Sequence, residues 1–543
     1  MKLFNKYFVG ALLLGSISLS LTSCDLDEYN PSSEGADAVF ATPEGMENLV
    51  NQLYYNFRWK YYGREDPVLY MEGAGDIWQN IAGNYDYGKQ LTRYIDLQGD
   101  RGQISGVWNR VYDNVNVANT VINRIDNVIG ISAEKKNDFE GEARCMRAYC
   151  YWWLVEFFGD IELRLDETSA AYFTATRTDR KVIYDQVIIP DAERATQLLP
   201  VNPYNGNVGR ATKKAAYALL ARVSLARAQY EAKGSAEQRA FYQKAYDAAK
   251  YVMDHKAALG ITLYNTYDEI WQAKNNKNNT EFLWVVTHSS LTSLNAQPNN
   301  PNRLHRYFTP MLVNKAGIVN TATSWEYPAA GGTDTNPNGG LLMPTYYFLK
   351  LWKDWDIRYQ VLFQEEFVEN SARGSYKWTP AMADRFLTPS LVGKTVMNDD
   401  VCLKFTKEEV TQAQKDAVNY ALIGINDVYE TENVNAQGGC KVRAYGNGGT
   451  STVYIATSFP RFMKYRIWDG DPNGTILLAA ANGNVGFADV PVMRYAELPL
   501  IAAEAKIGLG DPAAAAQIIK DEIRNQRIVA PGHTLAEAQA DVT

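Results

Sequence analysis

Residues 141–160 decide the fold, and they read GEARCMRAYCYWWLVEFFGD. Within and just before this stretch, apolar residues recur at steps of three and four, which places their side chains on one face of a helix. These residues are Phe139, Ala143, Met146, Cys150, Trp153, Leu154 and Phe157. Ser132 is a favoured N-cap residue, with Lys135 in place of a capping-box acid, and Gly159 is a typical helix end. The pattern predicts one long helix between Ser132 and Gly159.

The same periodicity extends outward from this helix. Residues 107–128 carry an apolar stripe, and residues 183–199 form a helical segment closed by Pro200. Two pairs of segments follow, 211–230 with 238–253 and 493–507 with 513–527. Alanines at helical spacing let two antiparallel helices approach closely, as in tetratricopeptide repeats. We therefore predict a mainly α fold, a tetratricopeptide-like scaffold of helical pairs.

Between residues 259 and 490 the long helical periodicity gives way to turn-rich sequence. Asn-rich, Pro-containing and Gly-Gly turns surround short strand-like runs such as residues 281–287. Loops this long in a compact protein more often serve function than not. We expect three parts that together form one compact domain over residues 24–543. They are an N-terminal helical-repeat part (41–258), a loop-rich ligand-binding part with short strands (259–490) and a C-terminal helical pair (491–543).

The N-terminus has the features of a secretory signal peptide, residues 1–23, with a basic start and an apolar run too short and too Ser-rich to span a membrane. The run ends in LTSC, which resembles the lipobox of bacterial lipoproteins and makes Cys24 the lipidated residue. Several acyl chains would anchor the protein stably, since each buried CH₂ contributes about 0.8 kcal/mol. Residues 24–40 are then a lipidated acidic tether, which resembles a surface-export signal.

Charge and composition narrow the range of partners and chemistries. Lys and Arg number 54 against 62 Asp and Glu, a net charge of −8, so no positive field attracts nucleic acid. Removal of the signal peptide takes away two lysines and gives 52 − 62 = −10. The chain has four His and no CxxC, GxSxG, HExxH or P-loop motif. This argues against a metal centre and against the enzyme classes that these motifs mark. The many carboxylates leave a glycosidase site open.

The remaining cysteines and one acidic turn carry weaker signals. The cysteines after the lipobox are Cys145, Cys150, Cys402 and Cys440. We interpret the first two as buried apolar residues and leave a disulfide between the last two open. Residues 469–474 copy the first half of a calcium loop, but Ala480 stands where such a loop has Glu, so an Asx-rich turn is favoured. We expect no metal and no cofactor.

The stretch 141–160 resembles the signature helix of the SusD/RagB family of nutrient-binding outer-membrane lipoproteins. Further matches follow in the family's order at residues 108–122, 209–222, 281–284, 344–358 and 494–505. The resemblance implies a surface-exposed lipoprotein that binds glycans and delivers them to a SusC-like TonB-dependent transporter, without acting as an enzyme. Glu162 departs from the family's usual Pro, and the chain ends at Thr543 without the family's closing helices, so we expect a fragment.

Two stretches, residues 76–87 and 301–327, combine flat aromatic rings with hydrogen-bonding side chains, as a sugar site requires. The resemblance points to the same two regions. The candidate substrate-binding residues are Trp78, Asn80, Tyr85, Arg303, Tyr307, Trp325 and Tyr327. Trp78 and Trp325 are equally compatible with core anchors. If they bind, replacing either by Ala should weaken glycan binding without shifting the melting temperature.

Two alternative functions stay open at this point. A lipid-anchored glycoside hydrolase would release reducing ends from polysaccharides. A helical-repeat adaptor would bind a large outer-membrane barrel and respond to no glycan.

Overall fold

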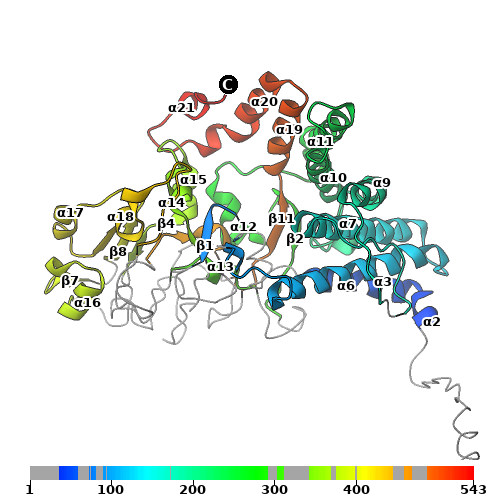
Figure 1. The fold of residues 1–543 in the computed structure, drawn as a ribbon, viewed down its shortest axis with the longest axis horizontal. Coiled ribbons are helices and arrows are strands. Elements are labelled where there is room, and N and C mark those ends of the chain that lie inside the picture. Colours follow the sequence, from blue (N-terminus) through cyan, green and yellow to red (C-terminus); the bar gives the residue numbers. More distant parts are fainter. Residues whose placement is uncertain are drawn as a thin grey trace, which may run out of the picture.

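The computed structural model describes residues 36–58, 73, 75–80, 90–92, 94–170, 173–291, 302–310, 342–368, 375–397, 400–443, 458–466, 478 and 486–543. Figure 1 shows long helices on one side of the molecule and short helices and strands on the other. The strands β1, β2 and β11 lie between the two sides. The mainly α, tetratricopeptide-like fold predicted from the sequence is confirmed.

The helical side is a row of helices in which neighbours along the chain pack against each other. Its members are α2 (Ala36–Phe40), α3 (Pro43–Asn56), α6 (Gly102–Arg124), α7 (Ala133–Phe158), α8 (Arg180–Ile183), α9 (Ile189–Leu198), α10 (Lys213–Ala228) and α11 (Ala236–Asp254). After the loop-rich part the chain returns, and α19 (Glu497–Gly508) packs on α11 and on α20 (Pro512–Ile518). The last helix described is α21 (Leu535–Gln539). The row is thus completed by helices distant in sequence.

Helix α7 forms where the sequence predicts it. The Ser132 hydroxyl accepts the hydrogen bond of the Lys135 N–H, and the chain leaves the helix at Gly159 with φ of 75°, a conformation that glycine adopts without strain. A buried ion pair and a buried hydrogen bond connect α7 to two neighbouring helices. Arg147 of α7 donates to Asp191 of α9 at 2.6 Å and to Asn119 of α6 at 2.8 Å. These contacts join α6, α7 and α9.

The segment predicted at 183–199 is helical but not uniform. It begins earlier, at α8, and passes through a π-helical turn (Tyr184–Ile188) before α9. Pro190 has no N–H to donate to the preceding turn, and a π turn accommodates the interrupted ladder.

The predicted helix at 493–507 is wrong at its start, and the predicted helix at 513–527 is wrong at its end. Residues Val490–Arg494 form strand β11, which pairs antiparallel with β2 (Phe282–Val286). The β-branched residues and Pro491 of this stretch favour a strand edge over a helix, so α19 begins only at Glu497. Helix α20 continues in a π-helical turn, Ile519–Ile523, and Arg524 leaves the helical conformation.

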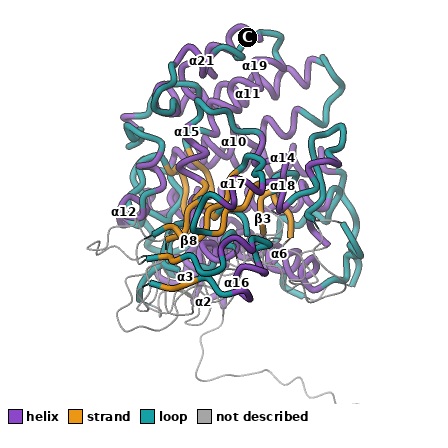
Figure 2. Tube along the Cα trace, turned by 90° about the vertical axis from the view of Figure 1, so that its left-hand side faces the viewer, coloured by secondary structure: helices purple, strands orange, loops and turns teal. Residues whose placement is uncertain are grey.

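The loop-rich side is built from short elements. Its strands are β1 (Trp78–Asn80), β3 (Leu342–Pro344), β4 (Phe363–Gln364), β5 (Glu366–Val368), β6 (Tyr376–Lys377), β7 (Thr395–Val396), β8 (Val401–Thr406), β9 (Ala421–Gly424) and β10 (Arg461–Phe462). Its helices are α12 (Ala273–Asn276), α13 (Leu304–Tyr307), α14 (Tyr346–Lys350), α15 (Ile357–Leu362), α16 (Pro380–Arg385), α17 (Gln412–Asp416) and α18 (Ile425–Val428). The strands form pairs, except for the three-stranded sheet β5-β8-β9. Figure 2 shows these strands surrounded by helices and loops.

All four cysteines that the structure describes are free thiols, so the disulfide left open between Cys402 and Cys440 is not formed. Cys145 and Cys150 are buried, as the sequence predicts. Burial raises the pKa of the Cys145 thiol beyond the physiological range, which suits a core residue rather than a reactive one.

Candidate functional site

Described parts of the two predicted sugar-binding stretches contact each other. The rings of Trp78 and Phe308 meet edge to face with centroids 4.7 Å apart. Strand β1 carries Trp78 and pairs with β3, and the Thr345 hydroxyl donates to the Asp76 carbonyl at 2.8 Å. Segments far apart in the sequence therefore converge here, between the two sides of the molecule.

Trp78 lies in an aromatic cluster rather than on the surface. Its side chain is 2% exposed, and its ring also packs edge to face against Phe348 and Phe462, at 5.3 and 4.9 Å. This is the core role that the sequence left open. The expectation that Trp78→Ala would leave the melting temperature unchanged is therefore corrected, because a buried indole of this size contributes to stability.

The other described candidates lie on the same two stretches of the chain as Trp78 and Phe308. Asn80 and Tyr307 are buried, and Arg303 is half-buried. Helix α13, which carries Tyr307, is held at its start by Asn302, whose side-chain N–H donates to the Ala488 carbonyl at 2.9 Å and whose oxygen accepts from the Leu304 N–H. These residues form a fixed base, and their part in ligand binding stays a prediction.

Several predicted positions lie outside the residues that the structure describes. They are Cys24, Tyr85, Trp325 and Tyr327, together with the calcium-like turn at 469–474. Among the described residues, no group of three or more His, Cys, Asp or Glu could hold a metal ion. No helix in the described part of the chain is both long and apolar enough to cross a bilayer.

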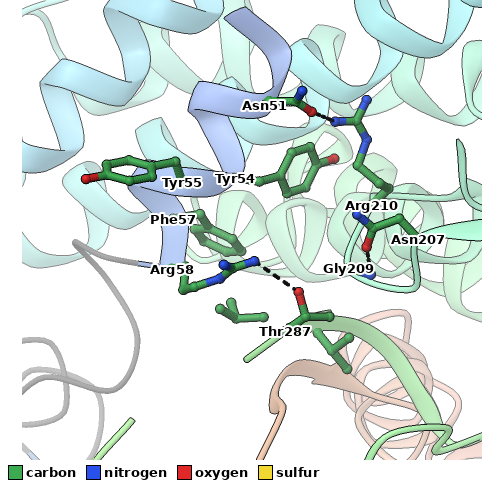
Figure 3. A pocket seen from close by; sticks show the side chains of 11 residues that line it. Asn51, Tyr54, Tyr55, Phe57, Arg58, Asn207, Gly209, Arg210 and Thr287 are labelled. Atoms are coloured by element: carbon green, nitrogen blue, oxygen red, sulfur yellow. Dashed lines mark hydrogen bonds between the residues drawn. The ribbon is translucent and has the colours of Figure 1, made fainter. Parts of the chain in front are cut away.

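A pocket that the sequence analysis missed opens between α3, the turn before α10 and the end of β2, with a volume of about 350 Å³ (Figure 3). Its polar and aromatic lining includes Asn51, Tyr54, Tyr55, Arg58, Arg210 and Thr287. Tyrosine rings, an amide, guanidinium groups and a hydroxyl are a lining that suits a polar, hydroxyl-rich ligand. In the sequence, Tyr54, Tyr55 and Arg58 lie close enough together to suggest a binding site. Arg210 and Thr287, which complete the pocket, come from distant segments.

The pocket wall is held in place by hydrogen bonds. Arg210 donates to the Asn51 side chain at 2.8 Å, and Arg58 reaches across to the Thr287 hydroxyl at 3.3 Å (Figure 3). The turn before α10 approaches β2 closely at Gly209. A Cβ at that position would lie 3.0 Å from two atoms of Thr287, so a larger residue would push the turn away.

A buried carboxylate stands behind this wall. Glu142 of α7 is 1% exposed and pairs with the Arg210 guanidinium at 2.8 Å. Burial raises the pKa of Glu142 to about 7, although the charge of Arg210 opposes the shift. Arg210 also stacks over the ring of Tyr54 at 5.0 Å, and the Tyr54 hydroxyl accepts from the Ala211 N–H at 2.9 Å. The pocket wall is thus tied to the signature helix.

Comparisons with known proteins identify matching families and folds. One family model, described as starch-binding associating with outer membrane, matches residues 26–225, and the SusD family model matches residues 347–542. A SusD-like protein of Bacteroides ovatus is 26% identical over 282 residues, which cover 50% of this chain and 49% of that protein. SusD-like protein P2 of Formosa agariphila is 23% identical over 344 residues, 63% of this chain and 60% of that protein. The matched part therefore spans about half of the first relative.

Solved structures share the fold across nearly the whole chain. NanU of B. fragilis superposes with a TM-score of 0.58 at 18% identity, covering 94% of this chain and 82% of NanU. Surface glycan-binding protein A of Bacteroides uniformis gives a TM-score of 0.57 at 15% identity, covering 92% of this chain and 84% of that protein. At these identities the likeness establishes the arrangement of the helices and the loop-rich part.

Proposed function

Because the chain belongs to the SusD/RagB family, we propose that it binds glycans at the cell surface and passes them to a transporter. The observation that carries the proposal is the pair of family matches, one of them to a model described as starch-binding. The glycan-binding name of the Bacteroides uniformis neighbour agrees with it. None of these matches carries the name of an enzyme.

The proposed glycan site lies where the stretches 76–87 and 301–327 meet. The buried aromatic cluster around Trp78 and Phe308 supports this view, because it joins the described parts of both stretches in a rigid base. We assign ligand contact to Tyr85, Arg303, Trp325 and Tyr327. Trp78, Asn80 and Tyr307 then act mainly by positioning them.

The chain is proposed to reach its glycan from a membrane anchor. Lipidation of Cys24 would hold the protein at the outer membrane, and the acidic residues Asp25, Asp27 and Glu28 would lie at the start of a tether. The partner is proposed to be a SusC-like TonB-dependent transporter. Cys24→Ala should move the protein out of the membrane fraction, and the wild type should co-purify with a large outer-membrane protein.

The decisive experiment is a glycan array or affinity gel with the protein lacking residues 1–24. Binding to at least one polysaccharide without release of reducing ends is the expected outcome. Trp325→Ala and Tyr327→Ala should weaken that binding at least tenfold, whereas Phe173→Ala, which removes a ring that is 95% exposed elsewhere, should not. Undiminished binding by both variants would remove this site, and turnover of the polysaccharide would favour a hydrolase.

A further inference from the structure

A second pocket, of about 280 Å³, lies at the start of α10 and shares Arg210 with the first one. It is enclosed by the turn before α10, the Asn-rich turn 276–279 and strand β2. Its volume is just below the usual range for small-molecule sites, which starts at about 300 Å³. It has room for one sugar unit or a small anion.

The charges that line this pocket are all positive. Lys214, Arg210 and Lys277 belong to the lining, and none of the lining residues that the structure describes is Asp or Glu. Lys277 is paired with Asp489 at 2.6 Å, and Arg210 with Glu142 at 2.8 Å. Lys214 forms no ion pair with any residue that the structure describes. Its pKa is lowered by burial alone, so it is a partly desolvated cation without a counter-charge.

Three buried donors on lining side chains have no hydrogen-bond partner among the residues that the structure describes. They are the Thr212 hydroxyl, one Nη of Arg210 and the Trp284 indole N–H, on side chains that are 4%, 5% and 2% exposed. Buried polar groups in folded proteins are nearly always paired, so three unused donors on side chains that line one cavity require an explanation. An acceptor in the pocket provides one.

The start of α10 adds to this pattern. Thr212 occupies the N-cap position but makes no side-chain cap hydrogen bond, and the first turn contains Lys213 and Lys214 with no acidic residue. A helix N-terminus carries partial positive charge and favours anions, so two lysines there oppose the helix dipole. A bound anion would relieve that repulsion.

We propose that this pocket binds an oxyanion carried by a sugar, with the charged oxygens facing Lys214, Thr212 and Arg210. Asn202 and Asn278 lie at its rim, have exposed side chains and make no side-chain hydrogen bond in the described structure. Amides of this kind can pair with sugar hydroxyls. A buried water could satisfy Thr212 or Trp284, but it would not neutralise Lys214, which is why the geometry favours an anion.

Isothermal titration of the full chain with galacturonic acid, galactose and inorganic phosphate tests the proposal. Galacturonic acid should bind, and binding should weaken as salt increases, whereas galactose, which lacks the carboxylate, should bind at least tenfold more weakly. Lys214→Gln should reduce galacturonic acid binding at least tenfold, and Thr212→Val several-fold. Lys250→Gln, the same charge change on an exposed lysine of α11, should leave it unchanged.

Several outcomes would overturn the proposal. Binding of galacturonic acid that is equal in wild type and Lys214→Gln would place any anion elsewhere, and no binding of either anion would leave the pocket without this role. Phosphate binding as tight as that of galacturonic acid would contradict the sugar specificity. Lys214→Gln removes an unpaired charge, so its melting temperature without ligand should not fall, and a fall would show that the lysine is structural.

This site is separate from the proposed glycan site, and the two proposals fail independently. Trp325→Ala should leave galacturonic acid binding intact, and Lys214→Gln should leave the binding of a neutral polysaccharide intact. Loss of both activities in either variant would contradict the separation.

Discussion

The two sides of the molecule are held together in different ways. On the helical side, long helices share buried ion pairs, and Asp191 accepts hydrogen bonds from both Arg144 and Arg147. On the loop-rich side, strands of two to six residues and short helices are fixed by local caps and by aromatic clusters such as the one around Trp78. Contacts between helices thus dominate one side, and local caps with a few large aromatic residues dominate the other.

The largest loss of stability is expected from breaking the buried ion pairs that Asp191 forms on the helical side. Asp191→Ala would leave Arg147, which is 7% exposed, without its carboxylate. Removing one partner of a buried pair costs about 3–5 kcal/mol, because the other charge stays desolvated. Urea denaturation should show a loss of this size in the free energy of unfolding.

Asp126→Ala is the matched control for that prediction. Asp126 pairs with Lys136 on the same side but is 76% exposed, and exposed pairs contribute about 0–1 kcal/mol. Equal losses in the free energy of unfolding of the two variants would show that the buried ion pairs do not stabilise the helical side more than exposed pairs do.

The aromatic cluster makes the corresponding prediction for the loop-rich side. Trp78→Ala should lower the free energy of unfolding by about 3 kcal/mol, since it removes a buried indole that contacts three phenylalanines. Phe173→Ala, at an exposed position, should leave stability within about 0.5 kcal/mol of the wild type. A melting temperature unchanged by Trp78→Ala would mean that the cluster does not carry the stability of this side.

The same difference explains what could be predicted from the sequence. The bounds of α7 follow from local signals, since apolar spacing, Ser132 and Gly159 lie within one stretch. The strand at Val490–Arg494 depends on pairing with β2, which no local pattern reveals. Likewise, Trp78 has polar neighbours in sequence, but the phenylalanines that bury it come from three distant segments.

Both pockets were beyond sequence reasoning for the same reason. Arg210 and Thr212 stood out only as part of a resemblance to a repeat, and nothing local shows that Lys214 has no carboxylate partner among the described residues. The absence of a partner is a property of the assembled structure. The two pockets, unlike the aromatic stretches 76–87 and 301–327, could therefore be found only after the fold was known.

The loss of stability at low pH should originate near β2, where the two sides of the molecule meet. His288 follows β2, and burial, with smaller effects of Arg58 and Lys277, lowers its pKa to about 3. The unfolded chain binds this proton below about pH 6.5 and the native state does not, so stability falls as pH decreases from 6.5 toward 3. The loss attributable to His288 is about 2 kcal/mol between pH 6.5 and pH 5, at about 1.4 kcal/mol per pH unit.

Denaturation curves at several pH values check this slope. The variant His288→Asn should show a flatter loss of stability between pH 6.5 and pH 5 than the wild type. Glu142 acts in the opposite sense, because its raised pKa favours the protonated native state and stability rises as pH falls from about 7. Identical slopes for His288→Asn and the wild type would exclude the histidine as the cause.

The smallest expected effects come from two helix-cap variants, which test whether the two sides unfold together. Ser132→Ala removes the cap of α7, and Thr411→Ala removes the capping box of α17, each at a cost of about 1 kcal/mol. If the molecule is one cooperative unit, both variants shift a single thermal transition by similar amounts. If the loop-rich side opens first, Thr411→Ala shifts only an earlier transition, and Ser132→Ala only a later one. Calorimetry separates these results. A single transition would mean that the aromatic cluster and the β2-β11 pair couple the two sides strongly enough to outweigh their different construction.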